Sequence, residues 1–294
     1  MTGDGRFTPA LIRRAFFILT AVVVAGTARA AVPAPAPPEL AQLNKPDAAE
    51  ARHIVEQFQQ MGLSGQHYLE FQLRVLPRRG PERILEGRLW GGRNPRGDIW
   101  RVTLRDASGQ ERRLLLQNGA NAAAWSFAGG RIEQVNAGGL FEPFFPGVEI
   151  SPFDLQMPFF YWPDFALEKV ERLRGRPAHV FFFRPPAAVA TQNQSISGVR
   201  AYLDTQFDAP VQTELIGRDG RVMKTLSLVD LKRVEGQTMV KTVDVRNELT
   251  RDKTRFQVTG VALKQEFSPA IFEPATLAED VRPPAPERIT RLAP

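Results

Sequence analysis

The residue types that most often carry enzyme chemistry are few in this sequence and show no catalytic spacing. Its 294 residues include no cysteine and three histidines, which are His53, His67 and His179. No pair of these histidines has the spacing of a metal site, and neither a Gly-x-Ser-x-Gly elbow nor a glycine-rich phosphate loop occurs. Carboxylates such as Asp204, Asp208 and Glu214 alternate with arginine and lysine, which is typical of cross-strand surface pairs. The sequence therefore predicts no enzyme, no metal site and no cofactor.

The charge of the chain also gives no sign of a nucleic-acid partner. The formal net charge is +6, but residues 1–30 contain four arginines and one aspartate, so the rest of the chain carries +3. Basic residues are spread among acidic ones, whereas a nucleic-acid site needs a concentrated basic stripe with aromatic side chains. We therefore expect no nucleic-acid partner.

The first 30 residues have the pattern of a secretory signal peptide. Arg13-Arg14 precedes an apolar run at 15–26, and Ala28-Arg29-Ala30 is a small-x-small cleavage site. A membrane anchor is the alternative, but the run is shorter than the roughly 20 apolar residues of a bilayer span. Because no cysteine is available for lipid attachment, we predict a soluble periplasmic protein. Residues 31–46, rich in alanine and proline, are predicted to form an extended spacer.

The C-terminal half of the chain predicts a run of antiparallel strands, the elements that must position any site. Within 238–247, Met239, Val243 and Val245 alternate with polar residues, so one face is apolar and the other is solvated. Asp219-Gly220 and Glu235-Gly236 provide the positive φ of hairpin turns. The predicted strands are 199–204, 211–216, 222–231, 238–247 and 255–267.

The N-terminal half predicts one helix followed by a second meander. Asp47 and Glu50 form a capping-box start, apolar residues follow at helical spacing up to Met61, and Gly62 ends the helix. Six strands then follow without an intervening helix, which excludes a parallel, doubly wound fold. They are predicted at 67–75, 82–90, 100–104, 112–117, 122–127 and 131–135, and two further strands at 167–173 and 178–183. The unbroken apolar run of the last strand predicts burial on both faces.

An aromatic segment at 138–165, called the aromatic cover below, interrupts the strand pattern. Its prolines forbid a long helix or a central strand, and Ser151-Pro152 can begin a short helix. A segment of this kind must lay its aromatic side chains against an apolar surface. The candidate ligand-binding residues are Phe141, Phe144, Phe145, Phe159, Phe160, Tyr161 and Trp162.

The C-terminal strands and turns follow in the order "VRAYLDTQFDAPVQTELIGRDGRVMKTLSLVDLKRVEGQTMVKTVDVRNE", preceded by "LRGRPAHVFFF" and followed by "FSPAIFEP". This order resembles the LolA-like superfamily of outer-membrane lipoprotein-sorting proteins. The matching positions are Tyr202, Asp204, Asp219, Gly220, Lys224, Asp230 and Gly236. The resemblance is strongest over 167–273 and only topological over 47–135. It implies a half-open barrel whose concave side is covered by helices and holds acyl chains, while the long aromatic cover departs from the family pattern.

Together these observations predict a mainly β fold. We expect a strongly curved antiparallel sheet, a half-open barrel of about eleven strands, with an N-terminal helix and the aromatic cover. The domain is predicted to span 47–278, followed by a proline-rich tail at 279–294.

The predicted function is that of a periplasmic carrier without enzymatic activity, whose partner is an acyl lipid or a lipoprotein. If the aromatic residues only complete a core, the alternative is an envelope scaffold or adaptor that binds protein partners through a sheet edge and holds no lipid. A third, weaker alternative is a hydrolase that acts on envelope lipids.

The signal-peptide hypothesis predicts that the mature protein begins at Ala31. Intact-mass measurement of protein from the soluble periplasmic extract should therefore give a chain that lacks residues 1–30. Soluble protein that still begins with Met1 would contradict the predicted cleavage.

Overall fold

The computed structural model of this chain describes residues 46–206 and 209–293. The predicted signal peptide, nearly all of the predicted spacer and Asp208 lie outside these residues. Among the described residues, no helix is long and apolar enough to cross a membrane.

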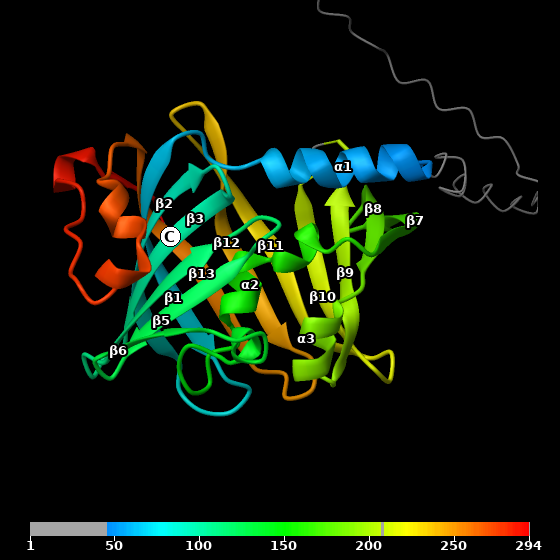
Figure 1. Cartoon of the computed structure of the whole chain (residues 1–294), viewed down its shortest axis with the longest axis horizontal. Helices are drawn as coiled ribbons and strands as arrows, with labels where there is room; N and C mark the ends of the chain where they lie inside the picture. Colours follow the sequence, from blue (N-terminus) through cyan, green and yellow to red (C-terminus); the bar gives the residue numbers. More distant parts are fainter. Residues whose placement is uncertain (1–45, 207–208, 294) are drawn as a thin grey trace, which may run out of the picture. The chain divides into compact units, whose positions relative to one another are not determined.

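The described residues form one antiparallel sheet with a few short helices (Figure 1). Its fourteen strands in this part of the chain are β1 Gln66–Leu76, β2 Arg83–Asn94, β3 Gly97–Arg105, β4 Glu111–Gln117, β5 Ala123–Ala128, β6 Arg131–Gln134, β7 Phe165–Leu173, β8 Arg176–Phe183, β9 Ile196–Asp204, β10 Pro210–Gly217, β11 Val222–Val234, β12 Gln237–Asn247, β13 Lys253–Gln265 and β14 Thr290–Arg291. The helices are α1 Ala48–Gln60, α2 Pro152–Gln156 and α3 Ala187–Gln192, with 3₁₀ turns η2 Gly139–Phe141, η3 Pro158–Tyr161, η4 Pro269–Phe272, η5 Pro274–Thr276 and η6 Pro286–Arg288.

Two meanders build the sheet, and they meet where β1 pairs with β13. The strand order is β6-β5-β4-β3-β2-β1-β13-β12-β11-β10-β9-β8-β7, with β14 beside β13. Each pair is antiparallel, and β6 and β7 are the edges of a sheet that does not close. The predicted half-open barrel is confirmed. The expected number of about eleven strands was too low: the strand predicted at 131–135 forms as β6, and the two-residue β14 was not predicted.

The concave face of the sheet carries the apolar core. Leu69, Phe71, Leu73 and Val75 of β1 point inward and are buried, in the alternation expected of a strand with one apolar face. Phe71 lies against Gly87, its partner on β2, where an added Cβ would come within 2.2 Å of the phenyl ring. A glycine is therefore required on β2 for this ring to lie flat against the sheet.

Helix α1 covers one end of the concave side. Asp47 caps it by accepting hydrogen bonds from the backbone N–H groups of Ala49 and Glu50, so the predicted start is confirmed. Its apolar face packs onto the β7–β9 end of the sheet, and the Phe58 ring lies 3.9 Å from the Phe160 ring, centroid to centroid. The apolar face of α1 thus serves core packing.

The C-terminal segment, residues 269–292, runs along the outer face of the sheet and is called the C-terminal strap. Arg101 of β3 is almost fully buried beneath it and donates hydrogen bonds to the carbonyl oxygens of Ile271, Thr276, Leu277 and Glu279. Because a guanidinium group presents several N–H donors in a fixed planar arrangement, this one side chain satisfies four backbone carbonyl groups of the irregular strap.

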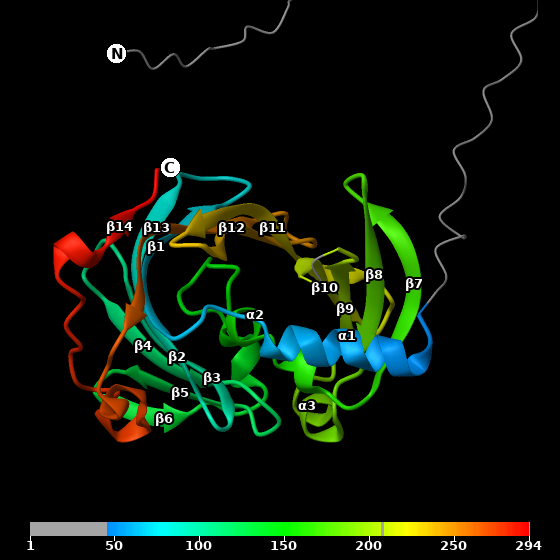
Figure 2. The same cartoon turned by 90° about the horizontal axis from the view of Figure 1, so that it is seen from above.

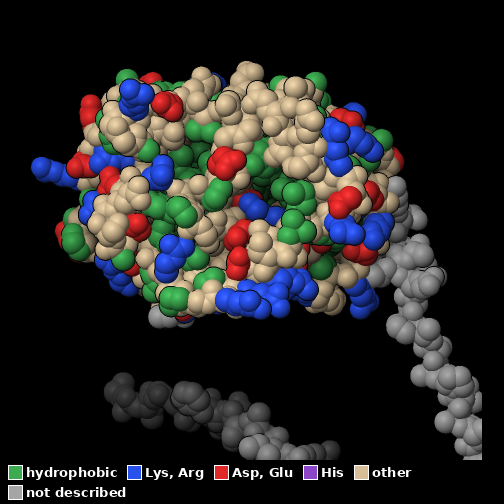
Figure 3. Space-filling model, turned by 90° about the horizontal axis from the view of Figure 1, so that it is seen from below, with side chains coloured by type: hydrophobic (Ala, Val, Ile, Leu, Met, Phe, Trp, Pro, Cys, Tyr) green, Lys and Arg blue, Asp and Glu red, His purple; other side chains and the backbone are tan. Residues whose placement is uncertain are grey.

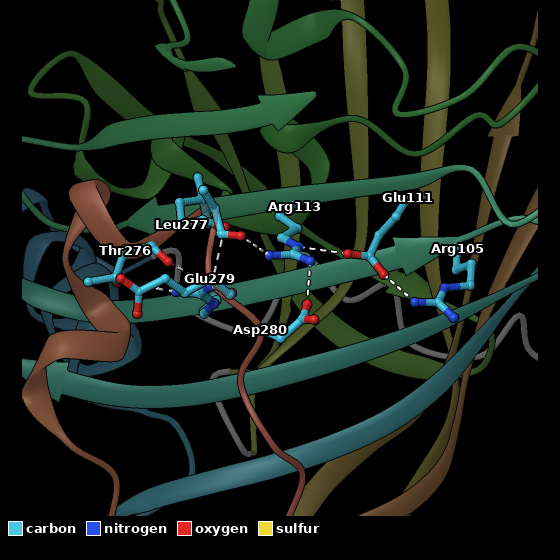
Figure 4. Close-up of polar contacts among 9 residues, drawn as sticks. Arg105, Glu111, Arg113, Thr276, Leu277, Glu279 and Asp280 are labelled. Carbon is cyan, nitrogen blue, oxygen red and sulfur yellow. Dashed lines mark hydrogen bonds and ion pairs between the residues drawn. The ribbon is translucent and has the colours of Figure 1, made fainter. Parts of the chain in front are cut away.

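A second arginine holds the middle of the same strap (Figure 4). Arg113 of β4 pairs with Asp280 and with Glu111, and it also donates to the carbonyl oxygen of Ala278. Strap residues Leu277 and Ile289 are buried against the outer face of the sheet. The outer face over β1–β5 is therefore covered by chain that is held through backbone carbonyls as well as apolar contacts.

The hairpin turns follow the predicted glycines. Gly220 has φ +78° in the connection between β10 and β11, and Glu235 and Gly236 both have positive φ between β11 and β12. In the first connection the N–H of Gly220 donates to the carbonyl of Gly217 over 2.9 Å.

We predict that Gly220→Val lowers the free energy of unfolding by about 1 kcal/mol or more, because valine is strained at positive φ. A Cβ at this position has no atom within 4 Å, so the loss reports backbone strain alone. Gly220→Asn is the matched control, since asparagine tolerates this conformation and should change stability less. Urea unfolding of the three proteins measures both effects, and equal midpoints would contradict the assignment.

Candidate ligand-binding site

The aromatic cover crosses the concave side of the sheet because of where its ends are attached. It connects β6 to β7, and these strands are the two opposite edges of the sheet. Seen from above, the sheet curves from β6 through β12 to β7, and α2 of the cover lies inside the curve (Figure 2). The connection between the edges therefore fills the apolar interior.

The seven predicted ligand-binding residues all belong to the cover, and they divide into two groups by what they pack against. Phe144 and Phe145 are buried with Val148 and Ile150 against β1–β5 and β11–β13. The second group packs with α1 and β7–β9, and it contains buried Phe159, Phe160 and Trp162 together with half-buried Phe141 and Tyr161. The predicted residues are thus brought to one face, but they do not converge on one point.

Three of the four consecutive aromatic residues at 159–162 are buried, because helix α1 packs over them as a second layer above the sheet. The chain at η3 makes a tight 3₁₀ turn, so Phe159, Phe160 and Trp162 all reach apolar surroundings and Tyr161 stays partly exposed. Phe160 lies between Phe58 of α1 and Phe183 of β8, with ring centroids 3.9 Å and 5.3 Å away. In this structure the cover residues are packed as core.

An ion pair joins the cover to the sheet inside the apolar interior. Nζ of Lys224, on β11, lies 2.8 Å from Oδ2 of Asp154, on α2, and both side chains are largely buried. The same carboxylate oxygen accepts hydrogen bonds from the backbone N–H and the hydroxyl of Ser151, which closes the capping box of α2. The Asp154 carboxylate, which completes the capping box of α2, therefore also links this helix to the sheet.

The other links between the cover and its surroundings are hydrogen bonds between a side chain and the backbone. Nε2 of Gln156 donates to the carbonyl oxygens of Gln117 and Ala123 at 2.7 and 3.1 Å, and Gln59 of α1 donates to the carbonyl of Phe160 at 2.7 Å. Glu149 donates its backbone N–H to the hydroxyl of Thr254 over 2.8 Å. These contacts fix the position of the cover on β4, β5, β13 and α1.

The sequence analysis did not predict the ion pair and hydrogen bonds that hold the cover, although the position of Lys224 in its strand indicates the ion pair. Lys224 matched the family pattern, but a lysine at an inward position, two residues before the inward Leu226, predicts a buried partner. The partner Asp154 could not be found from spacing, because it lies 70 residues away in an irregular segment.

Burial shifts the pKa of side chains in this part of the structure, including Glu149 of the cover and His67 of β1. Burial raises the pKa of the Glu149 carboxyl above its ordinary value, while a hydrogen bond from Asn247 and the nearby Lys224 oppose that change. Burial likewise lowers the pKa of the His67 imidazole. Among the described residues no cluster of histidine and carboxylate side chains could hold a metal ion.

Hydrophobic side chains surround a hollow on the lower face of the molecule, with lysine or arginine atoms visible inside it (Figure 3). This face lies opposite the view of Figure 2, where the curved sheet encloses α2. The hollow is therefore bordered by apolar side chains together with a few charged groups.

Solved structures with the same architecture come from several bacteria. An outer membrane lipoprotein-sorting protein domain from Vibrio parahaemolyticus, described as putative in its name, superposes with a TM-score of 0.68 at 17% identity, over 79% of this chain and 99% of that one. A DUF1329 family protein from Desulfovibrio piger gives 0.66 at 14% identity, over 78% and 98%. A LolA superfamily protein from Nitrosomonas europaea gives 0.60 at 14% identity, over 76% and 97%.

Sequence comparison adds a family match without a function. A family model described as "Uncharacterized protein" matches residues 146–279, which include most of the aromatic cover and strands β7–β13. No curated protein sequence is significantly similar to the chain. The agreement in architecture over almost the whole length of three solved structures shows that this chain has the LolA-like fold.

Proposed function

We propose that this protein is a periplasmic carrier without enzymatic activity, which binds an acyl lipid or the acyl chains of a lipoprotein between the sheet and the aromatic cover. The observation that carries the proposal is how the cover is attached. The backbone hydrogen bonds found for residues 139–162 are local, and side chains make the links to the sheet. The cover can therefore leave the concave face without breaking any strand pairing.

The energetics of exchanging cover for ligand support this proposal. Each CH₂ group removed from water contributes about 0.8 kcal/mol, so a dozen contribute on the order of 10 kcal/mol. Buried phenylalanine side chains contribute roughly 1.5–3 kcal/mol each, so four or five cover residues contribute a similar amount. An acyl chain could replace the cover side chains on the concave face at little net cost.

The names of two proteins with the same fold point in the same direction. One solved structure is described as a lipoprotein-sorting domain and another as a LolA superfamily protein. At 14–17% identity these two proteins share only the fold with this chain. The ligand that we propose for this chain is therefore inferred from the side chains of its own interior.

A scaffold that binds protein through a sheet edge is the second candidate. Because β11 and β12 lie inside the sheet, its support comes from the exposed apolar side chains Val229, Leu231 and Val240 near the β11–β12 turn rather than from an edge strand. Residues 228–231 also line a groove of about 340 Å³ beside the β7–β8 turn. The scaffold needs no ligand in the interior, so lipid analysis separates the two functions.

We predict that mature protein purified from periplasm and extracted with organic solvent releases acyl lipid in stoichiometric amount, as measured by mass spectrometry. Delipidated protein should then bind a fluorescent fatty-acyl probe. Trp162 lies in the cover and Trp90 on the outer face, so Trp162→Phe should weaken energy transfer to the probe and Trp90→Phe should not. Absence of both lipid and probe binding would reject the carrier and leave the scaffold.

We further predict that Phe160→Ala and Trp162→Ala each lower the free energy of unfolding by roughly 3–5 kcal/mol, because both side chains are buried. The milder variants Phe160→Leu and Trp162→Phe should remain folded and bind the acyl probe with altered affinity. Phe127→Leu, on the outer face of β5, is the control that should bind like wild type. Equal probe affinity in all folded variants would remove the cover from the binding site.

A further inference from the structure

Lys224 is a cation on the apolar face of the sheet. It projects inward from β11, where its register partners are Leu215 on β10 and Asn247 on β12, and its side chain is 17% exposed. Leu215, Leu226 and Val245 nearby all belong to the apolar packing of the interior. A cation in such surroundings is stable only when an anion is bound to it.

Two carboxylates of the cover lie near Lys224. Asp154 forms the 2.8 Å ion pair, and the Glu149 carboxyl interacts with Lys224 electrostatically. The proposed function requires the cover to move away from the concave face, and both anions then move with it. Lys224 stays on the sheet, unpaired against an apolar surface.

A second cation lies under the cover in a similar position. The guanidinium of Arg112, on β4, lies 5.4 Å from the centroid of the Phe145 ring, and its Nε–H finds no acceptor among the described residues. Lifting of the cover would remove Phe145 from Arg112 as well. The open interior would thus present positive charge within an apolar surface, which suits an amphiphile with an acidic group.

We propose that the cargo is an acyl amphiphile with an acidic group, a carboxylate or a phosphate, and that this group replaces Asp154 on Lys224 when the acyl chain replaces the cover. The inference rests on the proposed carrier function and narrows its ligand class. The ion pair then keeps the cover in place in the empty protein, and the ligand's own anion releases it. A neutral glyceride or ester lacks the charge needed for this exchange.

The test compares two probes that differ only in charge: a fluorescent hexadecanoic acid and its methyl ester. Delipidated wild-type protein should bind the acid about tenfold more tightly than the ester or better, because the carboxylate gains a charge-assisted hydrogen bond in the interior. Lys224→Met should lose this preference and bind the ester as wild type does. Lys224→Arg should restore the preference.

Lys253→Met is the matched control. Lys253 also pairs with a single aspartate, Asp244, at 3.2 Å, but on the outer face of the sheet. This variant should keep the wild-type preference for the acid. Asp154→Asn removes the competing carboxylate and should raise affinity for the acid, with the helix cap retained by the amide oxygen. Circular dichroism melting confirms that each variant is folded before titration.

The source of the anion is tested in the same assay. Inorganic phosphate and acetate at millimolar concentration should not displace the acid probe, whereas a single-chain phosphate lipid should. Displacement by phosphate alone would show a simple ion site and overturn the proposal, as would equal affinity of wild type for acid and ester. If neither probe binds, the carrier function itself is rejected, and this inference with it.

Discussion

The two edge strands of the sheet are joined by a single connection, and this constraint determines how the interior is filled. Because β6 and β7 lie at opposite ends of a curved sheet, residues 135–164 must cross its concave side. An apolar concave face cannot remain open to water without a large cost, so this connection carries the aromatic side chains that cover it. The position of the cover follows from topology, and its composition follows from the surface beneath it.

The two faces of the sheet are covered by different kinds of contact. On the outer face, Arg101 donates to four carbonyl groups of the C-terminal strap, and removing the strap would leave a buried guanidinium without acceptors. On the inner face, the cover depends on apolar packing, on the Lys224–Asp154 pair and on hydrogen bonds such as those of Gln156. A buried ion pair contributes little net stability, because desolvation offsets most of the attraction, but it does specify position. The strap is thus held by one arginine through its backbone carbonyls, whereas the cover is held by several separate side-chain contacts.

Local patterns were sufficient to predict most of the fold. Strand β12 at Gln237–Asn247 lies within one residue of the prediction, because alternation and the Glu235-Gly236 turn are local signals. The predicted burial of β8 on both faces is confirmed, since Phe181 packs inside and Val180 outside. Helix α3 was missed, because Ala187–Gln192 has neither a capping residue nor an apolar stripe. The site was predicted in part, since aromatic content reveals a cover, whereas its contact with Lys224 depends on tertiary structure.

Because this chain is only 14–17% identical to proteins of the same fold, the fold alone does not specify which ligand it binds. Chains that share 14–17% of their residues keep the same fold, so the fold depends on the pattern of residues and permits many different side chains. In the proposed carrier, apolar contacts alone would discriminate weakly between acyl chains. Discrimination must then come from the few charged positions on the concave face. In this chain those positions include Lys224 and Arg112, and both carry positive charge beneath the cover.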